Sequence, residues 1–169
     1  MPIDVVVRAG LAVGVELDRA TLRGLARELR RHRALATATA ALRRRDLSTH
    51  ALDARLARSG VRKPDRAEAL DTLVRAGLVD DDRFAATRAT ALADRGLGDD
   101  AVRWKLERNG VTADRAERAV ERLEPERNRI VRIVEKRGVS QATARLLARR
   151  GFSADAIEAA VGSHAGVEP

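Results

Sequence analysis

The chain has 169 residues, a net charge of +8 and a sequence pI near 11.2. It has no cysteine, which excludes disulfides and thiolate metal sites. It also lacks an apolar run of membrane-spanning length and a signal-peptide pattern, so we expect a soluble, cytoplasmic protein. Aromatic residues make up only 2 %, and there are four prolines. Long runs of Ala, Leu, Arg and Glu therefore predict an all-α protein, whose positive charge would attract polyanions.

Residues 1–17 hold a short apolar stretch broken by Gly10 and Gly14. Periodicity does not decide between a short helix and an extended segment here. From Asp18 an apolar stripe at helical spacing predicts a long helix that ends near residues 43–46. Basic side chains at that end suit the negative end of the helix dipole. Other arginines lie mostly off the stripe: Arg23, Arg27, Arg30, Arg31 and Arg33.

A short pattern, a Leu four residues before a Gly, occurs three times. Leu52, Leu56 and Gly60-Val61 recur fifty positions later, and a shorter copy spans residues 145–152. The later copies read Val102, Leu106 and Gly110-Val111, then Leu147 and Gly151-Phe152. Each glycine is predicted to end a helix in the left-handed conformation. An Asp with a Glu three positions on follows each glycine and predicts a capping box for the next helix: Asp65 and Glu68, Asp114 and Glu117, Asp155 and Glu158.

A further apolar helix is predicted ahead of each copy, over residues 34–45, 82–94 and 126–137. The repeating unit is then helix, link, helix, glycine turn, helix, and such units stack into an elongated array. The alternative is chance recurrence in a Leu- and Ala-rich chain, against which three copies with the Asp and Glu argue. The expected divisions are an N-terminal segment with the start of the long helix at 1–33, repeats at 34–79, 80–123 and 124–161, and a disordered tail at 162–169.

Catalytic chemistry finds no support in the sequence. Cys and Tyr are absent, and His32, His50 and His164 lack metal-ligand spacing. The glycines are isolated and form no phosphate-binding loop. The acidic run at residues 80–82 precedes a predicted helix, where it fits an N-cap with dipole-favourable charges better than a metal site. We therefore expect a protein that is not an enzyme and needs no cofactor or metal.

The basic residues recur in register with the glycines. Arg58, Arg108 and Arg149 each stand two positions before a repeat glycine. At about 100° per residue Arg58 and Arg108 face away from the buried side of their helices, with Arg55 and Lys105 flanking that face. Stacked repeats would align them into a stripe suited to a phosphate backbone. The alternative for each arginine is an ordinary solvated helix face.

Trp104, the one tryptophan, lies nearly opposite Val102 and Leu106 on its helix. It is either exposed, as an interface anchor or base-stacking platform, or covered by the third helix of its unit, and both readings stay open. The candidate interaction residues are Arg44, Arg45, Arg55, Arg58, Arg95, Arg103, Trp104, Lys105, Arg108, Arg145 and Arg149.

Residues 77–85 read Gly-Leu-Val-Asp-Asp-Asp-Arg-Phe-Ala and resemble the G-L-[LI]-D-D-x-x-[FY]-A signature of the RecX regulators of the RecA recombinase. Upstream, residues 45–48 and the following helix resemble that family's R-x-x-S-x-x-E-L-x-x-x-L stretch. Downstream, residues 95–98 with Leu106 and Gly110-Val111 resemble [KR]-G-x-G … L-x-x-x-G-[IV]. The resemblance runs from about residue 35 to 123, and more loosely to 161.

The resemblance implies a curved array of three-helix repeats that binds along the RecA–DNA filament. It further implies inhibition of ATP hydrolysis, strand exchange and SOS co-protease activity in DNA repair by homologous recombination, with possible direct contact to single- or double-stranded DNA. We expect a monomer without membrane contact. His50-Ala51, Trp104 and a short N-terminal segment depart from the family pattern. The competing interpretations are a DNA-binding module of helix-turn-helix units and a scaffold for an unrelated acidic protein.

Overall fold

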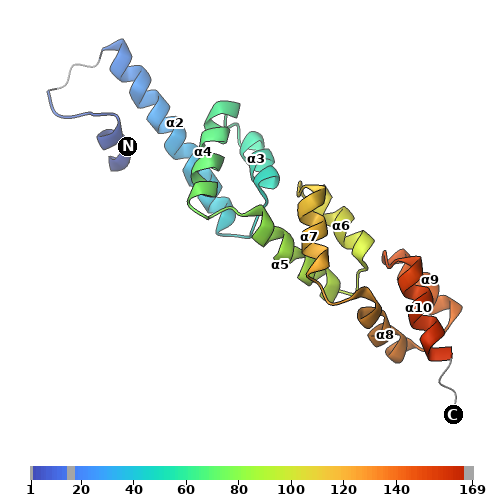
Figure 1. Ribbon diagram of the computed structural model, residues 1–169. Helices are drawn as coiled ribbons and strands as arrows, with labels where there is room; N and C mark the ends of the chain where they lie inside the picture. The colour runs from blue at the N-terminus through green and yellow to red at the C-terminus, as the bar shows by residue number, and fades with distance from the viewer. Residues whose placement is uncertain (1, 15–17, 166–169) are drawn as a thin grey trace. The chain divides into compact units, whose positions relative to one another are not determined.

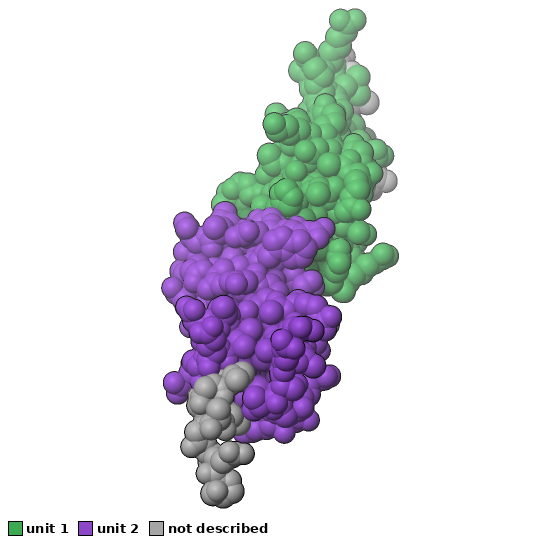
Figure 2. Space-filling model, turned by 90° about the vertical axis from the view of Figure 1, so that its right-hand side faces the viewer, with its two compact units in different colours: residues 1–80 green, residues 81–169 purple. Residues whose placement is uncertain are grey.

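The computed structural model describes residues 2–14 and 18–165, and side chains up to Ala160. Within these ranges the chain is all-α, as predicted, with ten helices and no strand. It divides into two compact units, residues 1–80 and 81–169 (Figure 2). The first holds α1 (Ile3–Arg8), α2 (Arg19–Leu42), α3 (Thr49–Arg58) and α4 (Lys63–Arg75). The second holds α5 (Asp81–Asp94), α6 (Asp99–Arg108), α7 (Ala113–Glu121), α8 (Glu126–Arg137), α9 (Gln141–Arg149) and α10 (Ala154–Ala165) (Figure 1).

The first unit is built on the long helix α2. Asp18 caps this helix, as its carboxylate accepts a hydrogen bond from the Thr21 amide at 2.7 Å. The early apolar stretch, left open by the sequence, contains helix α1, which buries Val5 and pairs Asp4 with His32 of α2 at 3.0 Å. Helices α3 and α4 pack against the C-terminal part of α2 around a core of Ala38, Ala41, Leu47, Leu52, Leu56, Leu70, Leu73 and Val79.

The second unit has two cores. Helices α5, α6 and α7 enclose Ala85, Ala89, Leu92, Val102, Leu106, Val111, Ala116, Ala119 and Val120. Helices α8, α9 and α10 enclose Ile130, Val134, Leu147, Phe152 and Ala160. In the described residues, helices α2 to α10 thus form three sets of three, each around its own core. The predicted boundaries of the repeats stay a prediction, and of the predicted tail only residues 162–165, the end of α10, are described.

The three repeat glycines end their helices as predicted. Gly60, Gly110 and Gly151 have φ values of 77°, 78° and 77°, in the left-handed region. In each copy the amide of the residue after the glycine donates a hydrogen bond to a carbonyl of the preceding helix. The pairs are Val61 with Leu56, Val111 with Leu106 and Phe152 with Leu147, at 3.1–3.2 Å. This is the Schellman arrangement, and it brings the apolar residue after the glycine onto the core.

The predicted capping boxes are wrong. Helices α4, α7 and α10 begin before the Asp, so that Asp65 is the third residue of α4 while Asp114 and Asp155 are the second residues of α7 and α10. In each copy the next helix begins two residues after the apolar residue that follows the glycine, so the Asp falls inside the helix and not at its N-cap. The acids still lie in the first turn, where a negative charge stabilises the helix dipole.

Two glycines bring the second and third helix sets into backbone contact. The amide of Gly98 donates to the Arg150 carbonyl at 2.9 Å, and the Asp100 amide donates to the Gly151 carbonyl at 3.2 Å. A Cβ atom on Gly98 would lie 2.2 Å from the Gly151 oxygen. The start of α6 therefore lies directly against the turn between α9 and α10, and Gly98 is required for this approach.

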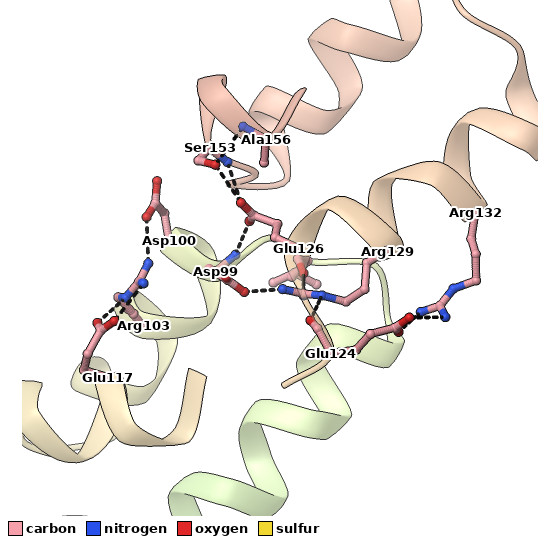
Figure 3. A network of polar contacts seen from close by, with 11 residues as sticks. Asp99, Asp100, Arg103, Glu117, Glu124, Glu126, Arg129, Arg132, Ser153 and Ala156 are labelled. Carbon is pink, nitrogen blue, oxygen red and sulfur yellow. Dashed lines mark hydrogen bonds and ion pairs between the residues drawn. The ribbon is translucent and has the colours of Figure 1, made fainter. Parts of the chain in front are cut away.

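Glu126 and Arg129, both on α8, complete this junction (Figure 3). The Glu126 carboxylate accepts from the Asp99 amide at 2.7 Å and from the amide and hydroxyl of Ser153 at 3.2 and 2.7 Å. It thus binds the first turn of α6 and the start of α10 at once. Arg129 is 5 % exposed; it donates to the carbonyls of Leu97 and Glu124 and pairs with the Asp99 carboxylate. Burial raises the pKa of Asp99 in spite of the opposing effect of Arg129.

Gly98→Ala is expected to lower the free energy of unfolding of the second unit by about 1–3 kcal/mol, because the added methyl group must displace the Gly151 backbone. Gly24→Ala is the matched control, since no neighbouring atom lies within 4 Å of a Cβ at that helical position. It should stabilise α2 by about 0.5–1 kcal/mol. Urea unfolding followed by circular dichroism measures both, and equal midpoints for Gly98→Ala and wild type would show that the close approach is not formed.

Arg129→Gln is expected to cost about 2–4 kcal/mol, because it leaves the partly buried Asp99 carboxylate and the Leu97 carbonyl without the buried cation that binds them. Arg132→Gln, on the same helix, removes an exposed ion pair to Glu124 and should cost less than about 1 kcal/mol. The same unfolding experiment compares the two variants. Similar losses for both would contradict a buried structural role for Arg129.

Candidate functional site

The recurring arginines lie at the surface at equivalent helix positions. Arg58, Arg108 and Arg149 are the last residues of α3, α6 and α9, and all three are exposed. The residues taken as the buried side of the first two helices, Leu52, Leu56, Val102 and Leu106, are all 0 % exposed. The helical-angle argument is therefore correct about orientation. Arg58 belongs to the first unit and the other two to the second, and their alignment into one stripe stays a prediction.

Trp104 is at the surface, which settles the alternative left open by the sequence. Its side chain is 53 % exposed. The guanidinium of Arg108 lies 4.6 Å from the centre of the indole ring, and the Lys105 ammonium lies 5.7 Å from it. Cations at these distances are attracted by the electron-rich ring face. Trp104 and Arg108, which are exposed, and Lys105, which is half-buried, thus form one surface cluster of an aromatic ring and two cations, here called the Trp104 cluster.

Arg103 differs from its neighbours because carboxylates within the protein already neutralise its charge (Figure 3). Its guanidinium makes two hydrogen bonds to Glu117 of α7, at 2.5 and 3.0 Å, and a third to Asp100 at 3.0 Å. The bond to Glu117 raises the pKa of Arg103, and the same bond lowers the pKa of the Glu117 carboxyl. Arg103 joins α6 to α7 and has little charge left for a partner.

The remaining predicted residues fall in several places. Arg44, Arg45, Arg95 and Arg145 are exposed, and Arg55 is half-buried. Arg44 and Arg55 come together across a hollow of about 390 Å³ between α2 and α3. The structure thus forms two groups from the predicted set, Arg44 with Arg55 in the first unit and the Trp104 cluster in the second.

Sequence reasoning missed the arginines on one side of α2. Arg23, Arg27 and Arg30 line a hollow of about 540 Å³, and Arg30, Arg33 and Arg62 line an adjoining hollow of about 580 Å³. The signal was present in the sequence, because Arg23, Arg27 and Arg30 recur at three- or four-residue spacing and so share a helix face. The apolar pattern by itself predicts only that these arginines avoid the buried stripe of the helix.

The acidic run at residues 80–82 lies at the start of α5, which begins at Asp81. Asp81 pairs with Arg115 at 3.2 Å, and Asp82 pairs with Arg118 at 3.1 Å. Both arginines are on α7, so the run also ties α5 to α7. In the part of the chain that the structure describes, no group of three or more His, Cys, Asp or Glu is placed to bind a metal ion.

None of the described helices combines the length and the apolar character needed to cross a membrane. No family model and no curated protein matches the sequence. Solved structures do match. One is described as the crystal structure of regulatory protein RecX, with a TM-score of 0.81 at 16 % identity over 96 % of this chain and 86 % of that one.

The second match is the crystal structure of RecX from Lactobacillus salivarius. Its TM-score is 0.72 at 15 % identity, covering 79 % of this chain and 96 % of that one. At this level of identity the likeness establishes the fold, and it agrees with the resemblance of residues 77–85 to the RecX signature. The chain has the fold of the RecX regulatory proteins.

Proposed function

We propose that this chain is a RecX-like regulator that binds along the RecA–DNA filament and restrains ATP hydrolysis, strand exchange and SOS co-protease activity. The observation that carries the proposal is the match in fold to two RecX structures, one of them described as a regulatory protein. The resemblance of residues 77–85 and their flanks to RecX motifs supports it independently of the fold. The regulator would act in the cytoplasm as a monomer, without a catalytic centre or cofactor.

The mechanism is steric and electrostatic. Exposed cations at the ends of α3, α6 and α9 meet DNA phosphates or acidic RecA surface, and the apolar cores keep these helices rigid. A body that contacts successive RecA subunits hinders the rearrangements that ATP turnover and filament growth require. The exposed Trp104 ring supplies the large, rigid contact that commonly anchors such interfaces.

The Trp104 cluster also favours a second candidate function, binding to DNA without a RecA target. An exposed indole beside Arg108 and Lys105 suits base stacking combined with phosphate contact. On this alternative, Trp104→Ala weakens binding to bare DNA and RecA activity is unaffected by the protein. The filament proposal expects inhibition of RecA well below the concentration that coats DNA.

Reversing Arg58, Arg108 and Arg149 together to Glu is expected to raise the concentration needed for half-inhibition of RecA's DNA-dependent ATPase by about tenfold or more. Loss of about 1.4 kcal/mol across the three contacts suffices for that change. The control reverses Arg75, Arg122 and Arg137, exposed arginines at the ends of α4, α7 and α8. The control carries the same charge change and a similar helix-dipole cost, so it should inhibit like wild type.

Circular dichroism checks that both triple variants keep their helices. Full inhibition by the folded Arg58, Arg108 and Arg149 variant would refute the role of these residues. Absence of inhibition by the wild-type protein, together with tight binding to bare DNA, would refute the filament proposal and favour the second candidate.

A further inference from the structure

Ser59 lies where two arginine-lined hollows of the first unit meet. It is exposed and forms the C-cap of α3, and its hydroxyl donates to the Arg55 carbonyl at 3.1 Å. The two hollows, of about 580 and 390 Å³, share Ser59 with Ala36 and Thr37 of α2. The Ser59 side chain therefore has arginines on both sides.

The smaller hollow combines two cations with no acid. Arg55 is four residues before Ser59, so the two side chains share one side of α3. Arg44 reaches the hollow from the turn that follows α2, and no Asp or Glu of the described chain lines it. Neither arginine forms an ion pair in the part of the chain that the structure describes. An anion attached to Ser59 would find both cations available.

The larger hollow adds a further cation, Arg33 of α2. Among the described residues, the one carboxylate that lines it is Asp65, which Arg62 binds at 2.8 Å and Arg30 approaches at 3.7 Å. The hydrogen bond from Arg62 lowers the pKa of Asp65, so this acid is ionised at neutral pH, and the two arginines offset its charge. A dianion on Ser59 is therefore attracted most strongly to the smaller hollow, which holds no acid.

The helix end opposes a negative charge at Ser59, because the dipole of α3 places about half a negative elementary charge there. A phosphoserine carries a charge of about −1.5 to −2 at neutral pH. Two full positive charges, on Arg44 and Arg55, outweigh the half charge of the helix end. Charge-assisted hydrogen bonds to the phosphoryl oxygens also replace the one neutral hydrogen bond that the hydroxyl loses. The balance favours a bound phosphoryl group.

Ser59 is also accessible to a modifying enzyme. Residues 57–60 are all exposed, and a helix end opens locally with little loss of free energy. Ser48, at the other end of α3, is by contrast fully buried. Arg58 and Arg62 flank Ser59 in the sequence and favour recognition by an enzyme with an acidic cleft.

We propose that Ser59 is a phosphorylation site and that Arg44 and Arg55 bind its phosphoryl group. The Ser59 Oγ attacks the γ-phosphorus of a nucleoside triphosphate held by a protein kinase. The new O–P bond forms as the bridging bond to the β-phosphate breaks, the nucleoside diphosphate leaves, and the hydroxyl proton passes to a base of the kinase. The phosphoryl group then links α3 to the end of α2 and cancels the positive charge of the smaller hollow. This modification is separate from the regulation of RecA proposed above and does not depend on it.

The first test is mass spectrometry of the full-length protein, isolated with phosphatase inhibitors from cells of its source organism. A protease that cleaves before Asp releases residues 53–64, in which Ser59 is the only residue with a hydroxyl group. A fraction of this peptide should carry one phosphoryl group. Its complete absence from both growing and stationary cells would overturn the proposal.

The second test is a ³¹P NMR titration of the full-length protein with phosphoserine inserted at position 59 during translation. The second pKa of phosphoserine is about 6, and two adjacent arginines should lower it to about 5 or below. Arg44→Gln and Arg55→Gln together should return this pKa to about 6. The matched control combines Arg43→Gln and Arg45→Gln, whose arginines are exposed and line neither hollow, and its pKa should stay low.

Circular dichroism should show the same helicity for the phosphoprotein and its two double variants. A pKa near 6 in the phosphoprotein with all its arginines, or equal pKa values in the two double variants, would overturn binding by Arg44 and Arg55. RecA is absent from both tests, so their failure is distinguishable from a failure of the proposed regulation of RecA.

Discussion

The structure depends most on one backbone hydrogen bond, made at each of the three repeat glycines, from the residue after the glycine to the carbonyl of the Leu five positions before it. The bond requires the left-handed glycine, seats Val61, Val111 or Phe152 on a core, and directs the next helix back across the one before it. It also determines where the recurring arginine lies, at the last helical position and pointing outward. A cation there stabilises the helix dipole as well as facing solvent, so structural and binding roles coincide at these positions.

The arginines divide into those that hold the fold and those that remain available. Arg129 is buried at the junction of α6 and α8, Arg103 joins α6 to α7, and Arg115 joins α7 to α5. Arg23, Arg27 and Arg33 have no ion pair in the described structure. A net charge of +8 therefore says little about where a polyanion would bind. The distribution of carboxylates in space decides it, because acids such as Asp81, Asp99 and Glu117 already hold an arginine of a neighbouring helix.

The helices and their glycine turns could be predicted because Leu and Gly spacing is local and each Leu stripe has only one side to bury. The predicted capping boxes were wrong because each Schellman turn ends at the apolar residue after the glycine. The next helix begins two residues later, before or within one residue of the Asp, so the Asp lies inside the helix. Arg103 was predicted to be available because its partner Glu117 is 14 residues away and reaches it only through packing of α7 on α6. Burial of Arg129 likewise depends on a neighbour 30 residues distant. The hollow beside Arg30 and Arg33 is also lined by Val61 and Arg62 from the link to α4, so the pattern along α2 alone could not reveal it.

The exposure of Trp104 has a practical consequence. The chain has one Trp and no Tyr, so its near-ultraviolet emission arises almost entirely from a single indole. That indole is half in water and beside two cations, within the second unit. Its fluorescence is therefore a label already present in the native protein, and one that reports on the surface of α6. Contact at this surface can then be followed without attaching a dye to a protein that has no cysteine to carry one.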